Sequence, residues 1–105
     1  MNEKVYFVYL LASGRNGTLY AGSTSHLVHR VFQHKSGTFD GFTRMHRVDR
    51  LVWFEVHGSA REMVVRERRI KEWQRAWKIE LIEAMNPRWH DLYGELLGGV
   101  SLRPE

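Results

Sequence analysis

The sequence predicts an α/β fold of the α+β type, in which a three-stranded antiparallel sheet is flanked by helices in the order β-β-α-β-α-α. Two strand-like runs surround a glycine-rich turn, a third apolar run lies at residues 51–56, and helical patterns follow the second and third runs. The chain has 105 residues, enough for one compact domain and too few for two. We expect the domain to span residues 1–93 and residues 94–105 to form a C-terminal tail.

A hairpin opens the predicted fold. Residues 5–11 (VYFVYLL) are strand formers, residues 13–17 (SGRNG) are turn formers, and the chain returns at residues 18–23 (TLYAGS). Tyr9 and Tyr20 would lie on adjacent strands and share one face if the hairpin registers well. Taken singly, each tyrosine is also an ordinary packing residue of a strand.

The first helix follows the hairpin. Thr24 or Ser25 can cap it, and it should run to about Lys35. Its apolar side would hold Leu27, Val28, Val31 and Phe32. Residues 36–50 hold two glycines and several basic residues, which is typical of a loop. Residues 51–56 (LVWFEV) form a short apolar run and predict the third strand.

Two further helices are expected after the third strand. Residues 59–62 (SARE) have the spacing of a capping box, so a helix should begin at Ala60 and run to about Trp73. A second helical pattern spans residues 75–84, with Trp77, Leu81 and Ile82 spaced for burial. The four tryptophans are expected in the core rather than as stacking platforms for bases.

Composition narrows the function classes. The formal net charge is +4 and the sequence pI is about 9.8, which suits a nucleic-acid partner. The chain has no cysteine, so thiolate chemistry, disulfides and cysteine-based zinc sites are excluded. No signal peptide and no apolar stretch of about 20 residues is apparent, so we expect a cytoplasmic protein without a membrane partner.

Several side chains are candidates for chemistry. Arg30 and His34 lie one helical turn apart, so an anion-binding guanidinium and a proton-carrying imidazole share a face. Glu67 lies within the apolar stripe of its helix, where a carboxylate needs a partner. That partner could be a basic residue or a divalent cation, since Mg²⁺ takes only one or two protein carboxylates. Both alternatives stay open at this point.

Basic residues gather in two stretches, the loop at residues 36–50 with its flanks and the helices at residues 60–78. Such runs are often solvated faces, but here they outnumber the neighbouring acids. The predicted nucleic-acid contacts are Lys35, Arg44, Arg47, Arg69, Lys71 and Arg75.

Taken in order, these residues resemble the GIY-YIG nuclease family, especially its small stand-alone bacterial members. The two name-giving elements correspond to Phe7-Val8-Tyr9 and Tyr20-Ala21-Gly22. The resemblance covers residues from about 6 to 93 and includes the stretches 41–43 (GFT), 50–55 (RLVWFE) and 73–78 (WQRAWK). In the resemblance, the family's catalytic residues correspond to Tyr9, Tyr20, Arg30, His34, Glu67 and Asn86. Arg30 and His34 match in both type and spacing, whereas the segment from Glu67 to Asn86 is longer than in the excision-repair and restriction-enzyme relatives.

The resemblance implies a GIY-YIG fold and an endonuclease that cuts DNA with Mg²⁺ or Mn²⁺, with RNA as an open alternative substrate. Tyr20 would be the general base, Arg30 would stabilise the phosphate and Glu67 would hold the metal. Excision-repair relatives carry a lysine where this chain has Ser23, so a cation beside Tyr20 would be missing or would come from elsewhere. The alternative function is a nucleic-acid-binding module of the same fold with little catalysis.

Overall fold

The computed structural model describes residues 4–38 and 41–98, and within them it confirms the predicted α+β fold. The sheet has strand order β2-β1-β3, and both pairings are antiparallel. Its strands are β1 (Tyr6–Ala12), β2 (Leu19–Thr24) and β3 (Arg50–His57). The helices are α1 (Leu27–Lys35), α2 (Phe42–His46), α3 (Ala60–Glu72), α4 (Arg75–Met85) and α5 (Tyr93–Gly98).

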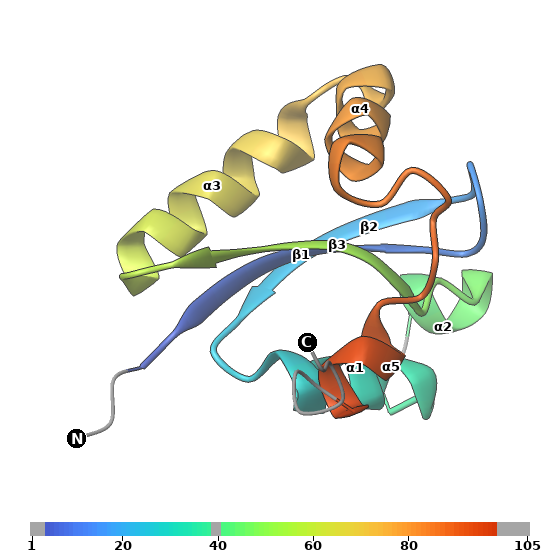
Figure 1. The fold of residues 1–105 in the computed structure, drawn as a ribbon, viewed down its shortest axis with the longest axis horizontal. Helices are drawn as coiled ribbons and strands as arrows, with labels where there is room; N and C mark the ends of the chain where they lie inside the picture. Colours follow the sequence, from blue (N-terminus) through green and yellow to red (C-terminus); the bar gives the residue numbers. More distant parts are fainter. Residues whose placement is uncertain (1–3, 39–40, 99–105) are drawn as a thin grey trace.

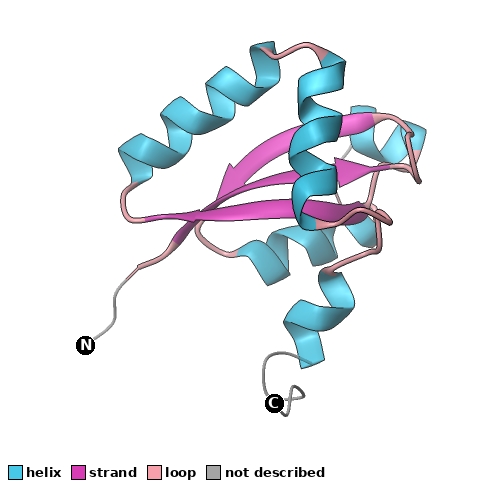
Figure 2. Cartoon of the chain, turned by 45° about the horizontal axis from the view of Figure 1, so that its top comes forward, coloured by secondary structure: helices cyan, strands magenta, loops and turns pink. Residues whose placement is uncertain are grey.

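Helices cover both faces of the sheet, with α3 and α4 on one side and α1 and α5 on the other (Figure 1). In Figure 2, α3 and α4 meet at a short connection, and α4 crosses in front of the strands. Period-2 alternation along β1 divides the core accordingly. Val8 and Leu10 belong to the cluster beneath α3 and α4, whereas Tyr9 and Leu11 belong to the cluster that holds Leu27 of α1.

The hairpin register fixes the geometry of the later site. Tyr9 pairs with Gly22 and Leu11 pairs with Tyr20, so Tyr9 and Tyr20 share a face as the sequence predicted. A Cβ at Gly22 would lie 2.5 Å from the Tyr9 hydroxyl oxygen. The buried Tyr9 ring therefore occupies the space that any other residue at position 22 would need.

The capping predictions hold for α3 but not for α1. Ser59 Oγ accepts a hydrogen bond from the Glu62 amide at 3.1 Å, so α3 begins as predicted. Residue His26, rather than Thr24 or Ser25, precedes the first turn of α1. Thr24 Oγ1 instead accepts from the His26 amide at 2.9 Å, which ends β2 and turns the chain into α1.

Several exposures also differ from the sequence prediction. Val28 and Phe32 of α1 are 39% and 53% exposed, because only Leu27 and Val31 face the sheet. Trp77 is 48% exposed, although Trp53 and Trp89 are buried as expected. The Trp77 ring meets the Trp73 ring edge-on, with centroids 6.1 Å apart.

Two short helices are additional to the predicted elements. The stretch predicted as a loop contains α2, and α5 lies within residues assigned to the tail apart from Tyr93. Leu96 of α5 packs against the cluster that contains Tyr9, so the packed structure extends beyond the predicted boundary at residue 93. The rest of the predicted tail, residues 99–105, lies outside the described residues.

Within residues 4–38 and 41–98, every helix is too short or too polar to cross a lipid bilayer.

The close approach of Tyr9 to Gly22 generates a stability prediction. Gly22→Ala should lower the free energy of unfolding by about 1–3 kcal/mol, because the new methyl group overlaps a ring that is held in the core. Urea denaturation measures this loss. Gly14→Ala, in the same hairpin with no heavy atom within 4 Å of the added Cβ, is the matched control and should be neutral or slightly stabilising. Equal stability of the two variants would contradict the steric argument.

Candidate active site on the β1–β2 hairpin

Three of the predicted site residues meet on the sheet face beneath α1. The Tyr9 hydroxyl and His34 Nε2 are 3.2 Å apart, within hydrogen-bond distance. The Tyr20 ring lies 5.4 Å from the His34 ring and 6.5 Å from the Tyr9 ring, measured between centroids. Tyr9 is buried and Tyr20 is partly exposed, so of the two phenols Tyr20 is the more accessible from solvent.

Arg30 joins this group from the helical turn before His34. Its guanidinium hydrogen-bonds to the Tyr9 side chain. This contact and the positive charge of Arg30 each act to lower the pKa of Tyr9, against the other contributions. Burial and the neighbouring Tyr20 outweigh that effect, so the pKa of Tyr9 is raised well above its usual value of 10.0. Tyr9 is therefore a neutral phenol throughout the physiological pH range.

His34 is buried, and both of its ring nitrogens have hydroxyl partners. Its Nδ1 lies 3.3 Å from Thr43 Oγ1, on the side away from Tyr9. Burial, followed by the charge of Arg30, lowers the pKa of His34 to about 4. Because Arg30 donates to the phenol oxygen, we assign the Tyr9 proton to the bond with Nε2 and the imidazole proton to Nδ1. With these protons, Arg30 donates to Tyr9, Tyr9 donates to His34, and His34 donates to Thr43.

Glu67 approaches from α3, on the other face of the sheet. Ser23 Oγ donates to Glu67 Oε1 at 2.5 Å, and the Lys71 ammonium lies 2.7 Å from Glu67 Oε2. Of the two partners that the sequence left open, the basic residue is therefore present. The pair is half open to water, since Lys71 is 52% exposed and Glu67 is 18% exposed. Because the Lys71 end is solvated, this pair holds the carboxylate less firmly than a fully buried ion pair would.

The edge position of β2 bears on how Glu67, on the α3 face, relates to the tyrosine cluster on the α1 face. Tyr20 points toward α1 and Ser23 toward α3, because alternate residues of a strand face opposite sides. The charge of Glu67 contributes to the raised pKa of Tyr9, so the carboxylate lies within electrostatic range of the phenol. That Glu67 and Arg30 act on one phosphate stays a prediction.

Asn86 lies apart from this group, at the end of α4. Its side-chain amide donates to the carbonyl oxygens of Val52 and His90, at 3.0 and 2.8 Å, and its Oδ1 accepts from the His90 amide at 3.0 Å. These bonds fasten the residues after α4 to β3. Asn86 therefore holds the segment after α4 against β3. Its predicted catalytic role stays a prediction.

At least four of the predicted nucleic-acid contacts have partners among the described residues. Lys35 donates to the Asp49 carbonyl at 2.9 Å and pairs with Asp91. Arg75 donates to the carbonyl oxygens of residues 16 and 17 in the hairpin turn, at 2.8 Å each. Lys71 pairs with Glu67, as described above. Arg44 interacts with another group of the protein as well, and Arg44, Arg47 and Arg69 are all exposed.

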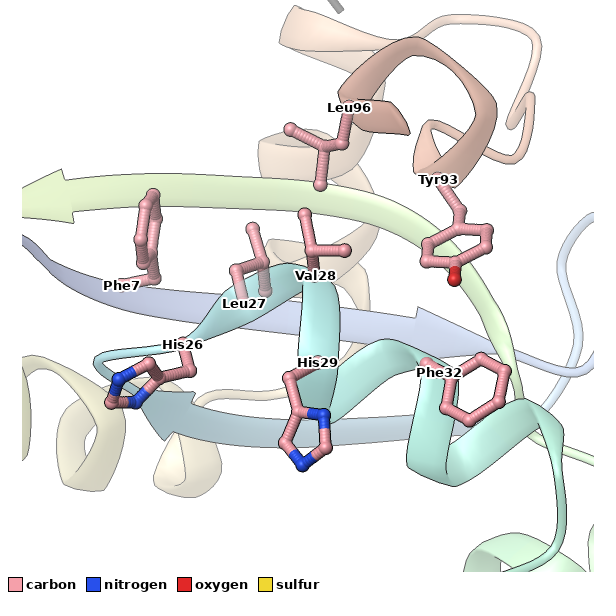
Figure 3. A pocket seen from close by; sticks show the side chains of 8 residues that line it. All are labelled: Phe7, His26, Leu27, Val28, His29, Phe32, Tyr93 and Leu96. Atoms are coloured by element: carbon pink, nitrogen blue, oxygen red, sulfur yellow. The ribbon is translucent and has the colours of Figure 1, made fainter. Parts of the chain in front are cut away.

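Two hollows flank the site and differ in chemistry. An apolar groove of about 540 Å³ lies between α1 and α5, lined by Phe7, Leu27, Val28, Phe32, Tyr93 and Leu96 with two histidines. Figure 3 shows Val28 pointing toward Leu96, while His26 and His29 point away from Leu96. On the other side of His34, a polar pocket of about 240 Å³ opens between α1 and α2. Only the second has cations in its walls.

Two site residues were missed by the sequence reasoning. Thr43 supports His34, and it belongs to a stretch predicted as a loop, where nothing in the pattern linked it to α1. Lys71 was predicted as a nucleic-acid contact, although its spacing of four residues from Glu67 could have indicated the ion pair. No group of three or more histidine, aspartate or glutamate side chains with metal-binding geometry occurs in the part of the chain that the structure describes.

Comparisons with known proteins agree with the fold. The family model described as the GIY-YIG catalytic domain matches residues 5–80. A UPF0213 protein from Bacillus pumilus is 35% identical over 85 residues, covering 81% of this chain and 86% of that protein. Another from Syntrophus aciditrophicus is 35% identical over 82 residues, covering 77% of this chain and 92% of that protein.

A solved structure shares the fold as well. The solution NMR structure of a UPF0213 protein from Bacillus halodurans has a TM-score of 0.52 and 26% identity, and the match covers 83% of this chain and 92% of that one. GIY-YIG domains are of the nuclease type, act on nucleic acid and generally depend on divalent metal. With a family match over most of its length and relatives at 35% identity, the chain belongs to the GIY-YIG family.

Proposed function

We propose that this protein is a divalent-metal-dependent endonuclease that hydrolyses phosphodiester bonds of DNA. The observation that carries the proposal is the cluster of Tyr9, Tyr20 and His34 on one sheet face, with Arg30 bonded to Tyr9. Tyrosine phenols, a guanidinium and a neutral imidazole are groups that can position a phosphate and accept a proton. A nuclease domain uses such groups for phosphodiester hydrolysis.

Glu67 fits a role as the metal ligand. A divalent cation such as Mg²⁺ or Mn²⁺ binds carboxylate oxygen and keeps several waters, so one partly exposed carboxylate suffices. Ser23 fixes the orientation of this carboxylate, and the Lys71 pair is weak enough to be displaced. When bound there, the cation would neutralise charge near the leaving oxygen.

Side chains of the protein itself would perform the other steps of the proposed reaction. Tyr20, the accessible phenol, is our candidate to accept a proton from the attacking water, a step that requires its phenolate form. Arg30 holds the phosphate oxygens through a two-pronged set of donors, which is the geometry that phosphate recognition favours. Tyr9 and His34 keep their protonation states near neutral pH, so they orient Arg30 and Tyr20 by hydrogen bonding and packing rather than by moving protons.

A second candidate is a nucleic-acid-binding module with little or no catalysis. Its specific support is that both oxygens of Glu67 already have partners within the chain. The two functions differ in one assay, a cleavage screen over single-stranded, duplex, flap and branched DNA and over RNA, with Mg²⁺ or Mn²⁺. Binding without metal-dependent scission on every substrate would favour the binding module over the endonuclease.

Glu67→Gln tests the metal assignment. The change removes the charge but keeps an oxygen that can accept from Ser23, so the free energy of unfolding should change by no more than about 0.5 kcal/mol. Metal-dependent cleavage should fall about 100-fold or more, because a bound cation contributes several kcal/mol to the transition state. Glu72→Gln, an exposed position on the same helix, is the control. Cleavage that follows only the folded fraction would overturn the assignment.

Arg30→Ala should affect binding as well as cleavage. Removing a phosphate contact weakens DNA affinity, and it should also lower the cleavage rate by about 100- to 1,000-fold, the range seen when one donor to a developing charge is lost. Fluorescence anisotropy and single-turnover cleavage measure the two effects separately. Arg88→Ala removes an equal charge from an exposed position and should leave both nearly unchanged. Equal effects of the two variants would show that only net charge matters.

His34 generates a pH prediction. Its pKa is about 4 in the folded chain against 6.5 for the ordinary group, so the unfolded chain binds the proton first as the pH falls. The free energy of unfolding should therefore drop by about 3 kcal/mol between pH 6.5 and pH 4. His34→Gln should flatten this part of the stability curve, whereas His29→Gln on the exposed side of α1 should not. Parallel curves for all three proteins would contradict the assignment.

A further inference from the structure

The polar pocket beside His34 shares a wall with the candidate active site. His34 contacts Tyr9 through Nε2 and Thr43 through Nδ1, so a single imidazole separates the catalytic group from the pocket. The pocket lies between the end of α1 and α2, and its walls include Lys35, Thr43, Arg44, Arg47 and Asp49. Any ligand in it lies one side chain away from the phenol of Tyr9.

The charge of the pocket walls favours an anion. Three cations and one carboxylate line a volume of about 240 Å³, and the Asp91 carboxylate pairs with one of these cations, Lys35, so the local charge is still positive. The volume suits a small group rather than a whole nucleotide chain. Lys35 is held by the Asp49 carbonyl and by Asp91, so its ammonium is fixed near the pocket. Arg44 and Arg47 are exposed and carry the two-pronged donors that fit phosphate oxygens.

The backbone at Arg47 is fixed by the end of α2, where this residue is the C-terminal cap. Arg47 adopts the left-handed conformation, with φ 55° and ψ 47°, which costs a non-glycine residue about 1–2 kcal/mol. The next residue, Val48, is fully buried, and its amide donates to the Thr43 carbonyl at 2.9 Å. The chain is thus held on both sides of Arg47, and the arginine is presented at the pocket from a fixed backbone.

We propose that this pocket binds the phosphate next to the scissile one on the same nucleic-acid strand. The proposal depends on the proposed nuclease function in one respect, because that function places the scissile phosphate at Arg30. Arg30 lies one helical turn, about 5.4 Å along α1, before His34 in the pocket wall. The second phosphate is therefore a neighbour in the strand and not a distant one. The subsite makes two consecutive phosphates the minimal recognised unit, and it selects a strand over a mononucleotide.

Short thymidine oligonucleotides test the subsite without requiring cleavage. The probes are d(TpT), which has one phosphate, and d(TpTpT), which has two, titrated in the presence of EDTA and followed by NMR chemical shifts. The wild-type chain should bind d(TpTpT) about tenfold more tightly than d(TpT), and replacing either phosphate of d(TpTpT) by a neutral methylphosphonate should remove that gain.

Arg47→Asn is the main variant, because asparagine tolerates the left-handed backbone while the charge is lost. It should bind d(TpT) as the wild type does and bind d(TpTpT) no more tightly than d(TpT). Arg44→Gln, on α2, should give the same pattern and covers the case in which Arg47→Asn fails to fold. Arg88→Gln removes an equal charge elsewhere and should keep the tenfold gain.

The outcomes separate the subsite from the nuclease function. Equal losses on both oligonucleotides in Arg47→Asn and Arg44→Gln would overturn the subsite in favour of general electrostatic attraction. Inorganic phosphate that binds the wild type as tightly as d(TpTpT), with shifts confined to α2, would overturn it in favour of a free-ion site. If the tenfold gain behaves as expected, the subsite stands even where no metal-dependent cleavage occurs, because the titration measures binding alone.

Discussion

The contact between the buried Tyr9 hydroxyl and His34 is the interaction on which the arrangement of this site depends. A phenol in the core must keep a hydrogen-bond partner, since leaving a buried hydroxyl without one costs about 1–3 kcal/mol. The partner comes from α1, one turn beyond Arg30, so satisfying Tyr9 also fixes the rotation of that helix against the sheet. The absence of a side chain at Gly22 lets the ring reach this position.

The edge strand explains how groups from two layers serve one site. A central strand would separate the α1 face from the α3 face by its neighbours on both sides. β2 has a neighbour on one side only, so Tyr20 on one face and Ser23 with Glu67 on the other lie at the same open border. The proposed nuclease function requires a substrate at this border to meet the phenol and the carboxylate together.

Local patterns predicted most of the fold, and the limits of that prediction have physical causes. The hairpin, β3 and the start of α3 depend on turn residues, apolar runs and a capping serine, all of which lie close together in the sequence. The position of Trp77 depends on how α4 meets α3, which helical periodicity does not encode. Thr43 reaches His34 only because the segment before it folds back into α2, and the Lys71 partner of Glu67 was assigned to nucleic acid because its charge was considered without its spacing.

Family resemblance transfers residue types more safely than roles, as Asn86 and His34 illustrate. The Asn86 side chain uses both amide hydrogens and its oxygen in bonds that fasten the segment after α4 to β3. A catalytic task would have to break at least one of them. His34, in contrast, has neighbours of the expected type, but burial and Arg30 keep it neutral down to about pH 4. A histidine that stays neutral over the working pH range holds a hydroxyl in place, and the proton must then move through a more exposed group. Tyr20 is the partly exposed phenol beside it, which is why the proposed chemistry assigns proton transfer to Tyr20 and orientation to His34.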